Sequence, residues 1–475
     1  MGKSDRHAPA AGSGTVLAII VASYLMIVVD ISIVITGLPR IQAELGFSAA
    51  RLSWVSNAYT LAFGGLLLLG ARAGDILGRR RMFIGGLSLF TLASVAIGLS
   101  PSAAWLLAAR AVQGAGAAVL APSTLALLST HFAEGPARTR ALSLYAAAAG
   151  IGATLGLVLG GLFADLLSWR AGFFVNLPIG LALVAAARKH VAETPVQAGR
   201  FDLAGAASAT LGMTSLVYGL VRAAEAGWQE PAALAALAGG ALMLAAFVAI
   251  ERRVGQPVLP LRLLAHRERA GAYAARMLFM AGAVGFWFFS TQFLQGVLQL
   301  RPLQAGLAFL PVTLPNFASA MAVPRLARRH GGGSLLLAGL LLGAIGLLWL
   351  GQADTHASYW LDVAPPMALI GLGQGLLLGP LTAAGVAGVA PRDAGAASGL
   401  VNVAHQLGGA LGLGVLVLIA AAAAPATAPG IDALAHRVSA VMDAGALLLA
   451  LALLVAWACI VRPRRRPAHR QETLA

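Results

Sequence analysis

The chain has 475 residues, of which 59% are hydrophobic and 11% are charged, and its formal net charge is +15 at pH 7. Soluble proteins carry roughly 25% charged residues, so these proportions exclude a soluble enzyme, a secreted disulfide scaffold and a disordered chain. Apolar content on this scale indicates a protein embedded in lipid, in which each helical span needs about 20 residues. The single cysteine, Cys459, excludes an internal disulfide or a cysteine-based metal site.

The first apolar run follows Lys3 and Arg6 and extends over Val16–Leu38. This run is too long for the hydrophobic region of a signal peptide, so we expect it to remain in the protein as the first transmembrane helix. Further apolar runs, bounded by charge, Gly or Pro, bring the predicted number of spans to fourteen. In chain order the spans are Val16–Leu38, Leu52–Leu69, Met82–Leu99, Ala103–Leu128, Leu142–Leu166, Ala171–Ala187, Leu203–Val221, Ala232–Ile250, Ala270–Gln295, Leu303–Val323, Ser334–Gly351, Ala364–Val386, Gly395–Ala424 and Val438–Val461.

The Lys and Arg residues set the predicted orientation. With the N-terminus in the cytoplasm, alternating spans place about three quarters of the 33 Lys and Arg residues on the cytoplasmic side. This asymmetry predicts a multi-pass protein of the inner (plasma) membrane with both termini in the cytoplasm. The basic residues are scattered through short connections, so we expect them to contact anionic lipid head groups of the bilayer and not nucleic acid.

The longest connections between spans, Arg188–Asp202 and Glu251–Arg269, flank the seventh and eighth spans. The chain therefore divides into six, two and six spans. The predicted parts are an N-terminal six-helix bundle (1–187), cytoplasmic linkers with inserted helices seven and eight (188–269), a C-terminal six-helix bundle (270–461) and a basic cytoplasmic tail (462–475).

A weak internal repeat relates the two groups of six spans. Gln113 precedes Pro122 in the fourth span, and Gln374 precedes Pro380 in the twelfth. Related halves of this kind suit alternating access around a site near the middle of the membrane.

Asp30 lies inside the first span, eight residues before its outer end, which is about 12 Å deep at a rise of ~1.5 Å per residue. A charge at this depth is costly unless it is paired or hydrated. We therefore interpret Asp30 as a protonatable carboxylate on a water-filled path, with an acid neutralised by a structural partner as the alternative. Arg110 lies at a similar depth in the fourth span and is the expected partner, although it could instead bind backbone carbonyls or extend toward the membrane surface. Arg276 is another arginine within a span.

Other polar residues within the spans are less specific signals. The thirteenth span carries Asn402, His405 and Gln406 at helical i,i+3 and i,i+4 spacing. His405 could titrate near neutral pH, and the alternative role of this face is hydrogen bonding between helices. The residues predicted to contribute polar groups to a cavity are Gln113, Asn316, Asn402, His405 and Gln406.

The sequence contains no zinc-protease, P-loop, EF-hand or hydrolase-elbow motif. We therefore expect no enzymatic activity, no metal site and no cofactor. No segment outside the membrane is long enough for a nucleotide-binding domain, so the energy for any transport is expected to come from a gradient.

Six segments carry a pattern of motifs shared with a known family. They are Val29–Pro39, Gly74–Arg81, Arg110–Gly116, Gly152–Gly161, Ser168–Gly180 and Phe201–Gly205. Together they resemble the major facilitator superfamily and, within it, the fourteen-span drug:proton antiporter family. Leu157 stands where the antiporter motif of that family has Pro.

The resemblance implies the major facilitator fold, with two six-helix bundles, an inserted helix pair and rocker-switch alternating access. It also implies that Asp30 takes the proton and helps to hold a cationic substrate, and that Arg110 couples to Asp30. The residues of the implied antiporter helix motif are Gly152, Gly156, Gly160 and Gly161. Those of an implied cytoplasmic latch are Gly74, Asp75, Gly78, Arg79 and Arg80, in which Asp75 can face a helix N-terminus.

The predicted function is proton-coupled multidrug efflux of hydrophobic cationic or neutral compounds, such as antibiotics. The expected partners are the small-molecule substrate, protons and the lipid bilayer, and the expected state is a monomer. The alternative is a narrow-specificity exporter of an endogenous natural product or metabolite. A membrane sensor or scaffold is disfavoured because the segments outside the membrane are too short to signal.

Overall fold

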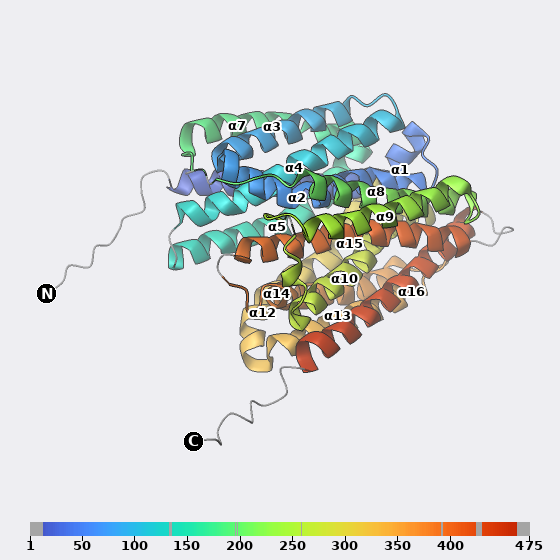
Figure 1. Ribbon diagram of the computed structural model, residues 1–475. Coiled ribbons are helices and arrows are strands. Elements are labelled where there is room, and N and C mark those ends of the chain that lie inside the picture. Colours follow the sequence, from blue (N-terminus) through green and yellow to red (C-terminus); the bar gives the residue numbers. More distant parts are fainter. Residues whose placement is uncertain are drawn as a thin grey trace, which may run out of the picture.

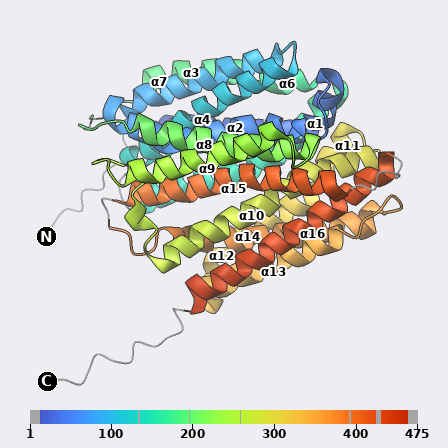
Figure 2. The same ribbon diagram turned by 45° about the vertical axis from the view of Figure 1, so that its right-hand side comes forward.

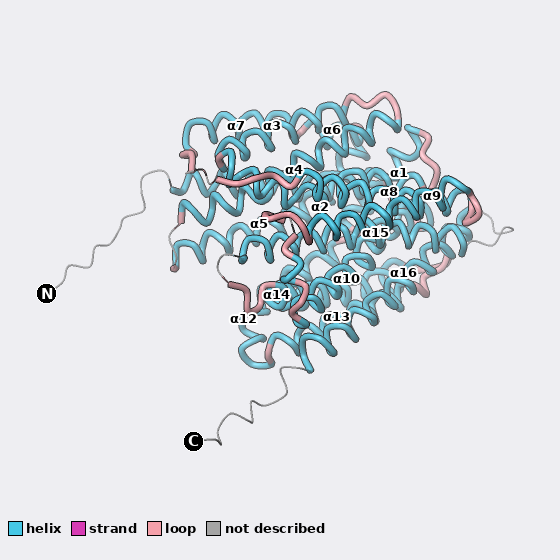
Figure 3. The backbone as a smooth tube through the Cα atoms, in the orientation of Figure 1, coloured by secondary structure: helices cyan, strands magenta, loops and turns pink. Residues whose placement is uncertain are grey.

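The computed structural model describes residues 13–132, 135–194, 196, 198–257, 259–390, 393–423 and 430–462. Within these ranges every regular element is helical, as Figure 3 shows. The α-helices are α1 (Ser13–Leu45), α2 (Trp54–Leu77), α3 (Arg79–Gly98), α4 (Ala103–His131), α5 (Pro136–Leu166), α6 (Trp169–Phe174), α7 (Asn176–His190), α8 (Leu203–Ala226), α9 (Pro231–Glu251), α10 (Arg267–Gln292), α11 (Pro302–Leu307), α12 (Leu310–His330), α13 (Gly332–Leu350), α14 (Ala364–Gly385), α15 (Ala394–Ala423) and α16 (Gly430–Ala456). The short helical turns are η1 (Arg51–Ser53), η2 (Leu261–Leu263), η3 (Phe293–Val297), η4 (Tyr359–Val363) and η6 (Trp457–Val461).

Fourteen helical stretches of the described chain are long and apolar enough to cross a membrane. This confirms the predicted number of spans. The helices extend several residues beyond the predicted apolar cores, because polar residues at a helix end can lie at or beyond the membrane surface. Pro39, for example, lies inside α1 instead of ending it.

Proline divides two of the spans into consecutive helices. The sixth span consists of α6 and α7, which meet at Val175. Pro178 has no N–H with which to bind the carbonyl of Phe174 four residues earlier, so the first turn of α7 is free to begin separately. The tenth span likewise consists of α11 and α12, with Pro311 in the first turn of α12.

The helices form two bundles with an inserted pair between them (Figure 1). One bundle contains α1 to α7 and the other contains α10 to α16. The inserted helix α8 packs against α2 of the first bundle and α15 of the second, and α9 packs on α8. The chain enters α1 and leaves η6 at the same end of the molecule, here called the terminal end, as Figure 2 shows. The opposite end is called the distal end.

Glycines of α5 let that helix lie very close to α1. Gly152, Gly156 and Gly160 are four residues apart and face α1; a Cβ atom on Gly156 would lie 2.6 Å from the carbonyl oxygen of Val29. In lipid, small residues of this kind permit the close van der Waals contact that holds helices together. Three of the glycines in the predicted antiporter motif therefore act as packing positions.

The fourth glycine of that motif, Gly161, faces the other bundle. A Cβ atom there would lie 3.0 Å from Cα of Leu303 in α11, and a Cβ atom on Gly306 would lie 2.5 Å from the carbonyl oxygen of Leu157. Leu157 is itself buried within an unbroken α5. The two bundles are thus in direct backbone contact near the distal end.

Candidate functional site

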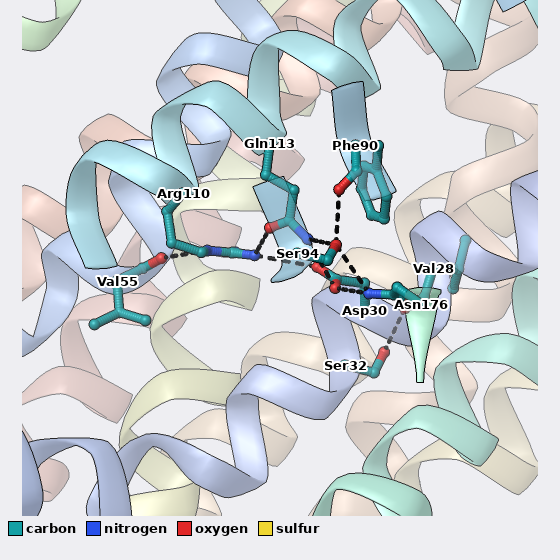
Figure 4. A network of polar contacts seen from close by, with 9 residues as sticks. All are labelled: Val28, Asp30, Ser32, Val55, Phe90, Ser94, Arg110, Gln113 and Asn176. Carbon is teal, nitrogen blue, oxygen red and sulfur yellow. Dashed lines mark hydrogen bonds and ion pairs between the residues drawn. The ribbon is translucent and has the colours of Figure 1, made fainter. Parts of the chain in front are cut away.

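Asp30 of α1 and Arg110 of α4 form a buried ion pair. Nη1 of Arg110 lies 3.1 Å from Oδ2 of Asp30, and the side chains of Arg110 and Asp30 are 2% and 1% exposed, respectively. Both lie in the core of the N-terminal bundle (Figure 4). The structure thus joins the two charged residues that the sequence places at similar depth in the membrane.

Gln113 connects both members of this pair. Its Oε1 accepts a hydrogen bond of 2.6 Å from Nη1 of Arg110, and its Nε2 donates one of 2.9 Å to Oδ1 of Asp30. The same Nε2 lies 2.8 Å from Oγ of Ser94. Arg110 and Gln113 are one helical turn apart on α4, so both project toward α1.

Asn176 donates the third hydrogen bond to the Asp30 carboxylate. Its Nδ2 lies 2.6 Å from Oδ1 of Asp30 and 3.2 Å from Oγ of Ser94. Ser94 in turn donates to the carbonyl of Phe90 in its own helix, α3. Because Asn176 is the first residue of α7, the division of the sixth span helps to place it beside Asp30.

Arg110 has further contacts that do not involve the carboxylate. Its Nε donates a hydrogen bond of 3.0 Å to the carbonyl of Val55, and its guanidinium lies 4.4 Å from the ring centroid of Tyr59. An aromatic face attracts a guanidinium that is removed from water. Arg110 is therefore held in place even when the charge of Asp30 changes.

We call these six residues the Asp30 network. They are Asp30, Tyr59, Ser94, Arg110, Gln113 and Asn176. In this conformation the buried Asp30 carboxylate is enclosed by donors from two other helices, α4 and α7. A proton added to Asp30 would cancel its charge and weaken its attraction to Arg110, so the network can respond to a proton.

A second buried arginine, Arg276, lies in the C-terminal bundle. Its side chain is 8% exposed. Its Nε lies 3.2 Å from Nδ1 of His405 in α15, and its Nη1 lies 3.0 Å from Oγ1 of Thr382 in α14. The predicted cavity residue His405 therefore binds an arginine of a neighbouring helix.

The other predicted cavity residues are not brought together. Gln406 packs against Gly64 of α2 across the boundary between the bundles. Asn402 donates to the carbonyl of Ser398 in its own helix. Asn316 lies on α12, where its carbonyl accepts a hydrogen bond from Ser319. Of the five predicted polar residues, Gln113 belongs to the Asp30 network and His405 binds Arg276.

The predicted latch lies at the terminal end, where α2 meets α3. Asp75 of α2 pairs at 3.0 Å with Arg79, the first residue of α3. The N-terminus of α3 is instead bound by Glu193, whose two carboxylate oxygens accept hydrogen bonds of 3.0 and 3.2 Å from the backbone N–H groups of Arg80 and Arg81. The position at a helix N-terminus that we expected for Asp75 is therefore occupied by Glu193.

Gly74 and Gly78 also belong to this latch. Gly78 has a φ of +103° and joins α2 to α3. A Cβ atom on Gly78 would meet the carboxylate of Glu193 at 2.8 Å, so both the backbone conformation and the space favour glycine. A Cβ atom on Gly74 would make an ordinary contact, 3.7 Å from Cγ of Arg79.

Sequence reasoning missed four residues that complete these sites. Ser94, Tyr59 and Asn176 are common polar types within apolar runs, and no spacing rule connects them to Asp30. Asn176 does lie in one of the recognised motifs, which was the available signal. Glu193 lies in the connection after α7, 113 residues from its partner Arg80, so only the fold brings it to α3.

No group of three or more His, Cys, Asp or Glu side chains that could hold a metal ion is found among the described residues.

Solved structures with the same architecture are membrane transporters. The chain is similar to a mutant of the nucleoside transporter NupG, with a TM-score of 0.67 and 12% identity over 93% of this chain and 100% of that one. It is equally similar to a bacterial homologue of the human lysosomal transporter Spinster, with a TM-score of 0.67 and 14% identity over 95% of this chain and 98% of that one. The two bundles around a buried polar network thus define a polytopic membrane protein with a transporter fold.

The family follows from the sequence comparison. Residues 20–413 match the model of the Major Facilitator Superfamily, and the chain belongs to that family.

Three relatives have names that refer to antibiotics. The cephamycin export protein CmcT of Amycolatopsis lactamdurans is 43% identical over 88% of this chain and 87% of the relative. The puromycin resistance protein pur8 of Streptomyces alboniger is 39% identical over 94% of this chain and 90% of the relative. The methylenomycin A resistance protein of Streptomyces coelicolor is 30% identical over 98% of both chains.

Proposed function

We propose that this chain exports hydrophobic small molecules, including antibiotics, from the cytoplasm in exchange for protons. The observation that carries the proposal is the ion pair of Asp30 and Arg110, each at most 2% exposed, within a membrane-spanning bundle. A buried ionisable pair in a membrane is costly to maintain and is typical of ion and proton pathways. Export agrees with the names of the relatives, one of which refers to export and two to resistance.

The proposed cycle couples a proton on Asp30 to movement of the bundles. α1 carries Asp30, and six residues later the carbonyl of Thr36 accepts a hydrogen bond of 2.9 Å from Gln295 of the other bundle. Protonation of Asp30 weakens its ion pair with Arg110 of α4. The packing of α1 against α4 within its own bundle changes as a result. Because α1 also touches the other bundle, that change alters the contact between the bundles. A substrate would be taken up at the terminal end and released at the distal end, in a rocker-switch cycle.

The proposed orientation places the terminal end in the cytoplasm of a bacterium, as the positive charge of the connections predicts. The contact of α5 with α11 at the distal end then closes the outer side. Three arginines and one carboxylate line a hollow of the terminal end, whose lining is Arg80, Arg81, Ile84, Gly85, Ser88, Arg188 and Glu193. Guanidinium groups beside apolar side chains suit contact with anionic lipid head groups at the inner membrane surface.

The test is transport by purified protein in liposomes with an imposed proton gradient. Puromycin and ethidium are supplied as test compounds, and proton movement is followed with an entrapped pH-sensitive dye. We expect compound-dependent proton movement in the wild type and its loss in Asp30→Asn. Asp165→Asn is the matched control, because Asp165 lies near the distal end of α5 and has no hydrogen bond or ion pair among the described residues. Coupled transport that survives in Asp30→Asn would contradict the role of Asp30.

A second candidate is a narrow-specificity exporter of one natural product. The names of the three relatives favour it, because each refers to a single compound. The same liposomes, tested with cephamycin, puromycin and methylenomycin A separately, distinguish the candidates. Transport of one compound alone would support narrow specificity, whereas transport of several unrelated compounds would support multidrug efflux.

A further inference from the structure

Arg276 is a buried cation without a charged partner among the described residues. It lies nine residues after the start of α10, which is roughly 14 Å along the helix at ~1.5 Å per residue. Its hydrogen-bond acceptors, Nδ1 of His405 and Oγ1 of Thr382, are neutral, since a ring nitrogen that accepts a hydrogen bond carries no proton. No carboxylate of the described residues lies within ion-pair distance of Arg276, and its Nη2 makes no hydrogen bond to them.

Arg110 and Arg276 differ in the net charge that they contribute to the buried interior of the protein. Arg110 is neutralised by Asp30 at 3.1 Å, so that pair contributes no net charge. Arg276 contributes a full positive charge because nothing in the described chain cancels it. A cation buried in a membrane protein and left without a counter-ion favours an anion as its missing partner.

The opposite bundle carries a stacked aromatic pair on α1 and α5. Helix α1, which carries Tyr24, packs against α10, which carries Arg276. Tyr24 stacks on Tyr145 of α5 with ring centroids 3.9 Å apart and an angle of 11° between the rings. The hydroxyl of Tyr145 lies 3.0 Å from Oγ1 of Thr124. The buried cation and Tyr24 of the stacked pair thus lie on two helices, α10 and α1, that pack together across the boundary between the bundles.

We propose that Arg276 binds the anionic group of an exported amphiphilic molecule, a carboxylate or an ionised phenol, while Tyr24 and Tyr145 contact its apolar body. The guanidinium can offer its free Nη2 to an oxygen of the ligand and still be held by His405 and Thr382. The inference rests on the proposed export function and refines its substrate class. It differs from the cationic substrates expected from the sequence, because the charge of Asp30 is already neutralised and the charge of Arg276 is not.

The test is equilibrium binding to the full-length protein in nanodiscs of neutral phosphatidylcholine. Three probes share one aromatic body and differ in the head group: pyrenebutyrate, pyrenebutanol and pyrenebutyltrimethylammonium. We expect the wild type to bind pyrenebutyrate about tenfold more tightly than pyrenebutanol and to bind the ammonium probe most weakly. Arg276→Gln should lose the preference for pyrenebutyrate and keep its affinity for pyrenebutanol, which also shows that the variant is folded.

The matched control is Arg269→Gln. Arg269 is also buried on α10, but its guanidinium binds the backbone carbonyls of Leu263 and Ala387, so its replacement should leave the preference unchanged. If the wild type binds the carboxylate and the alcohol equally, or if the preference survives in Arg276→Gln, the proposal is overturned. Binding needs no gradient, so a failure here is distinct from a failure of proton coupling.

A lipid phosphate is another source of negative charge at this site. Nanodiscs that contain phosphatidylglycerol distinguish it from a soluble carboxylate. An unchanged affinity for pyrenebutyrate supports a site for soluble amphiphilic anions. An affinity that falls in the wild type and not in Arg276→Gln supports the same anion site and identifies the head group as a competing ligand.

Discussion

Asn176 donates a hydrogen bond of 2.6 Å from Nδ2 to Oδ1 of Asp30, although 146 residues separate the two in the sequence. The bond joins the first turn of α7 to the middle of α1. Together with Gln113 and Arg110 it gives the enclosed carboxylate three protein donors. These three donors stabilise the ionised form of the buried carboxylate.

Replacing Asn176 with Ala should destabilise the protein by about 1–3 kcal/mol, the range for a buried polar group that loses its partner. The charge of Asp30 remains and one of its donors is lost, so we also expect slower proton-coupled export. Thermal unfolding in detergent measures the first effect and the liposome assay the second. The control is Asn57→Ala, since Asn57 is equally buried and its Nδ2 has no hydrogen-bond partner among the described residues. Equal losses in the two variants would contradict the importance of the Asn176 bond.

Replacing one or both residues of the Asp30–Arg110 ion pair separates its contribution to stability from its role in export. Replacement of Arg110 with Met should destabilise the protein by about 3–5 kcal/mol, because it leaves the Asp30 carboxylate buried and uncompensated. The double variant Asp30→Leu with Arg110→Met removes both charges and replaces them with apolar groups. We expect it to regain most of the lost thermal stability, since a buried pair is often no more stabilising than well-packed apolar residues.

The same double variant should show no proton-coupled export. Thermal unfolding checks the recovery of stability, and liposome transport checks the loss of export. Both are measured on the wild type, on Arg110→Met and on the double variant. Proton-coupled transport by the double variant would show that the proton site lies elsewhere. A double variant that is no more stable than Arg110→Met would show that the pair is needed for packing.

The sequence was sufficient for the number of spans and for the pairing of Asp30 with Arg110, because length, hydropathy and depth in the membrane are one-dimensional properties. It was not sufficient to predict which other side chains contact this ion pair. Asn176 and Ser94 reach Asp30 only because α3 and α7 pack beside α1, and no local pattern encodes that arrangement. For Arg276, the absence of a nearby acid among the described residues emerges only once the helices are placed.

The N-terminus of α3 provides a prediction at the terminal end. Replacement of Glu193 with Gln should destabilise the protein by about 1 kcal/mol, because a neutral amide accepts fewer backbone hydrogen bonds and no longer interacts with the helix dipole. The difference from the wild type should shrink at high salt, which screens that interaction. Thermal unfolding at low and high salt measures the loss of stability and its dependence on salt. Asp165→Asn controls for the loss of one negative charge, and a loss of equal size in that control would contradict the capping role.

The contact between the bundles at the distal end should govern which conformation the protein adopts. A Cβ atom on Gly306 of α11 would lie 2.5 Å from the backbone oxygen of Leu157 in α5. A backbone atom cannot rotate away as a side chain can, so Gly306→Ala should force the two bundles apart at this end. Gly379→Ala is the matched control in the same bundle, because its added Cβ atom would make an ordinary contact of 3.6 Å with Val323.

The conformational change can be measured by labelling a single cysteine. Cys459 is the only cysteine of the chain, so a Cys459→Ser background permits a reporter in Leu303→Cys, beside Gly161. We expect a membrane-impermeant maleimide to label this reporter about fivefold faster with Gly306→Ala, the population change that roughly 1 kcal/mol of strain produces. Gly379→Ala should leave the labelling rate unchanged. Equal labelling in all three proteins would mean that the contact between α5 and α11 yields locally to the added methyl group, and that closure of the distal end depends on other contacts such as the bond from Gln295 to Thr36.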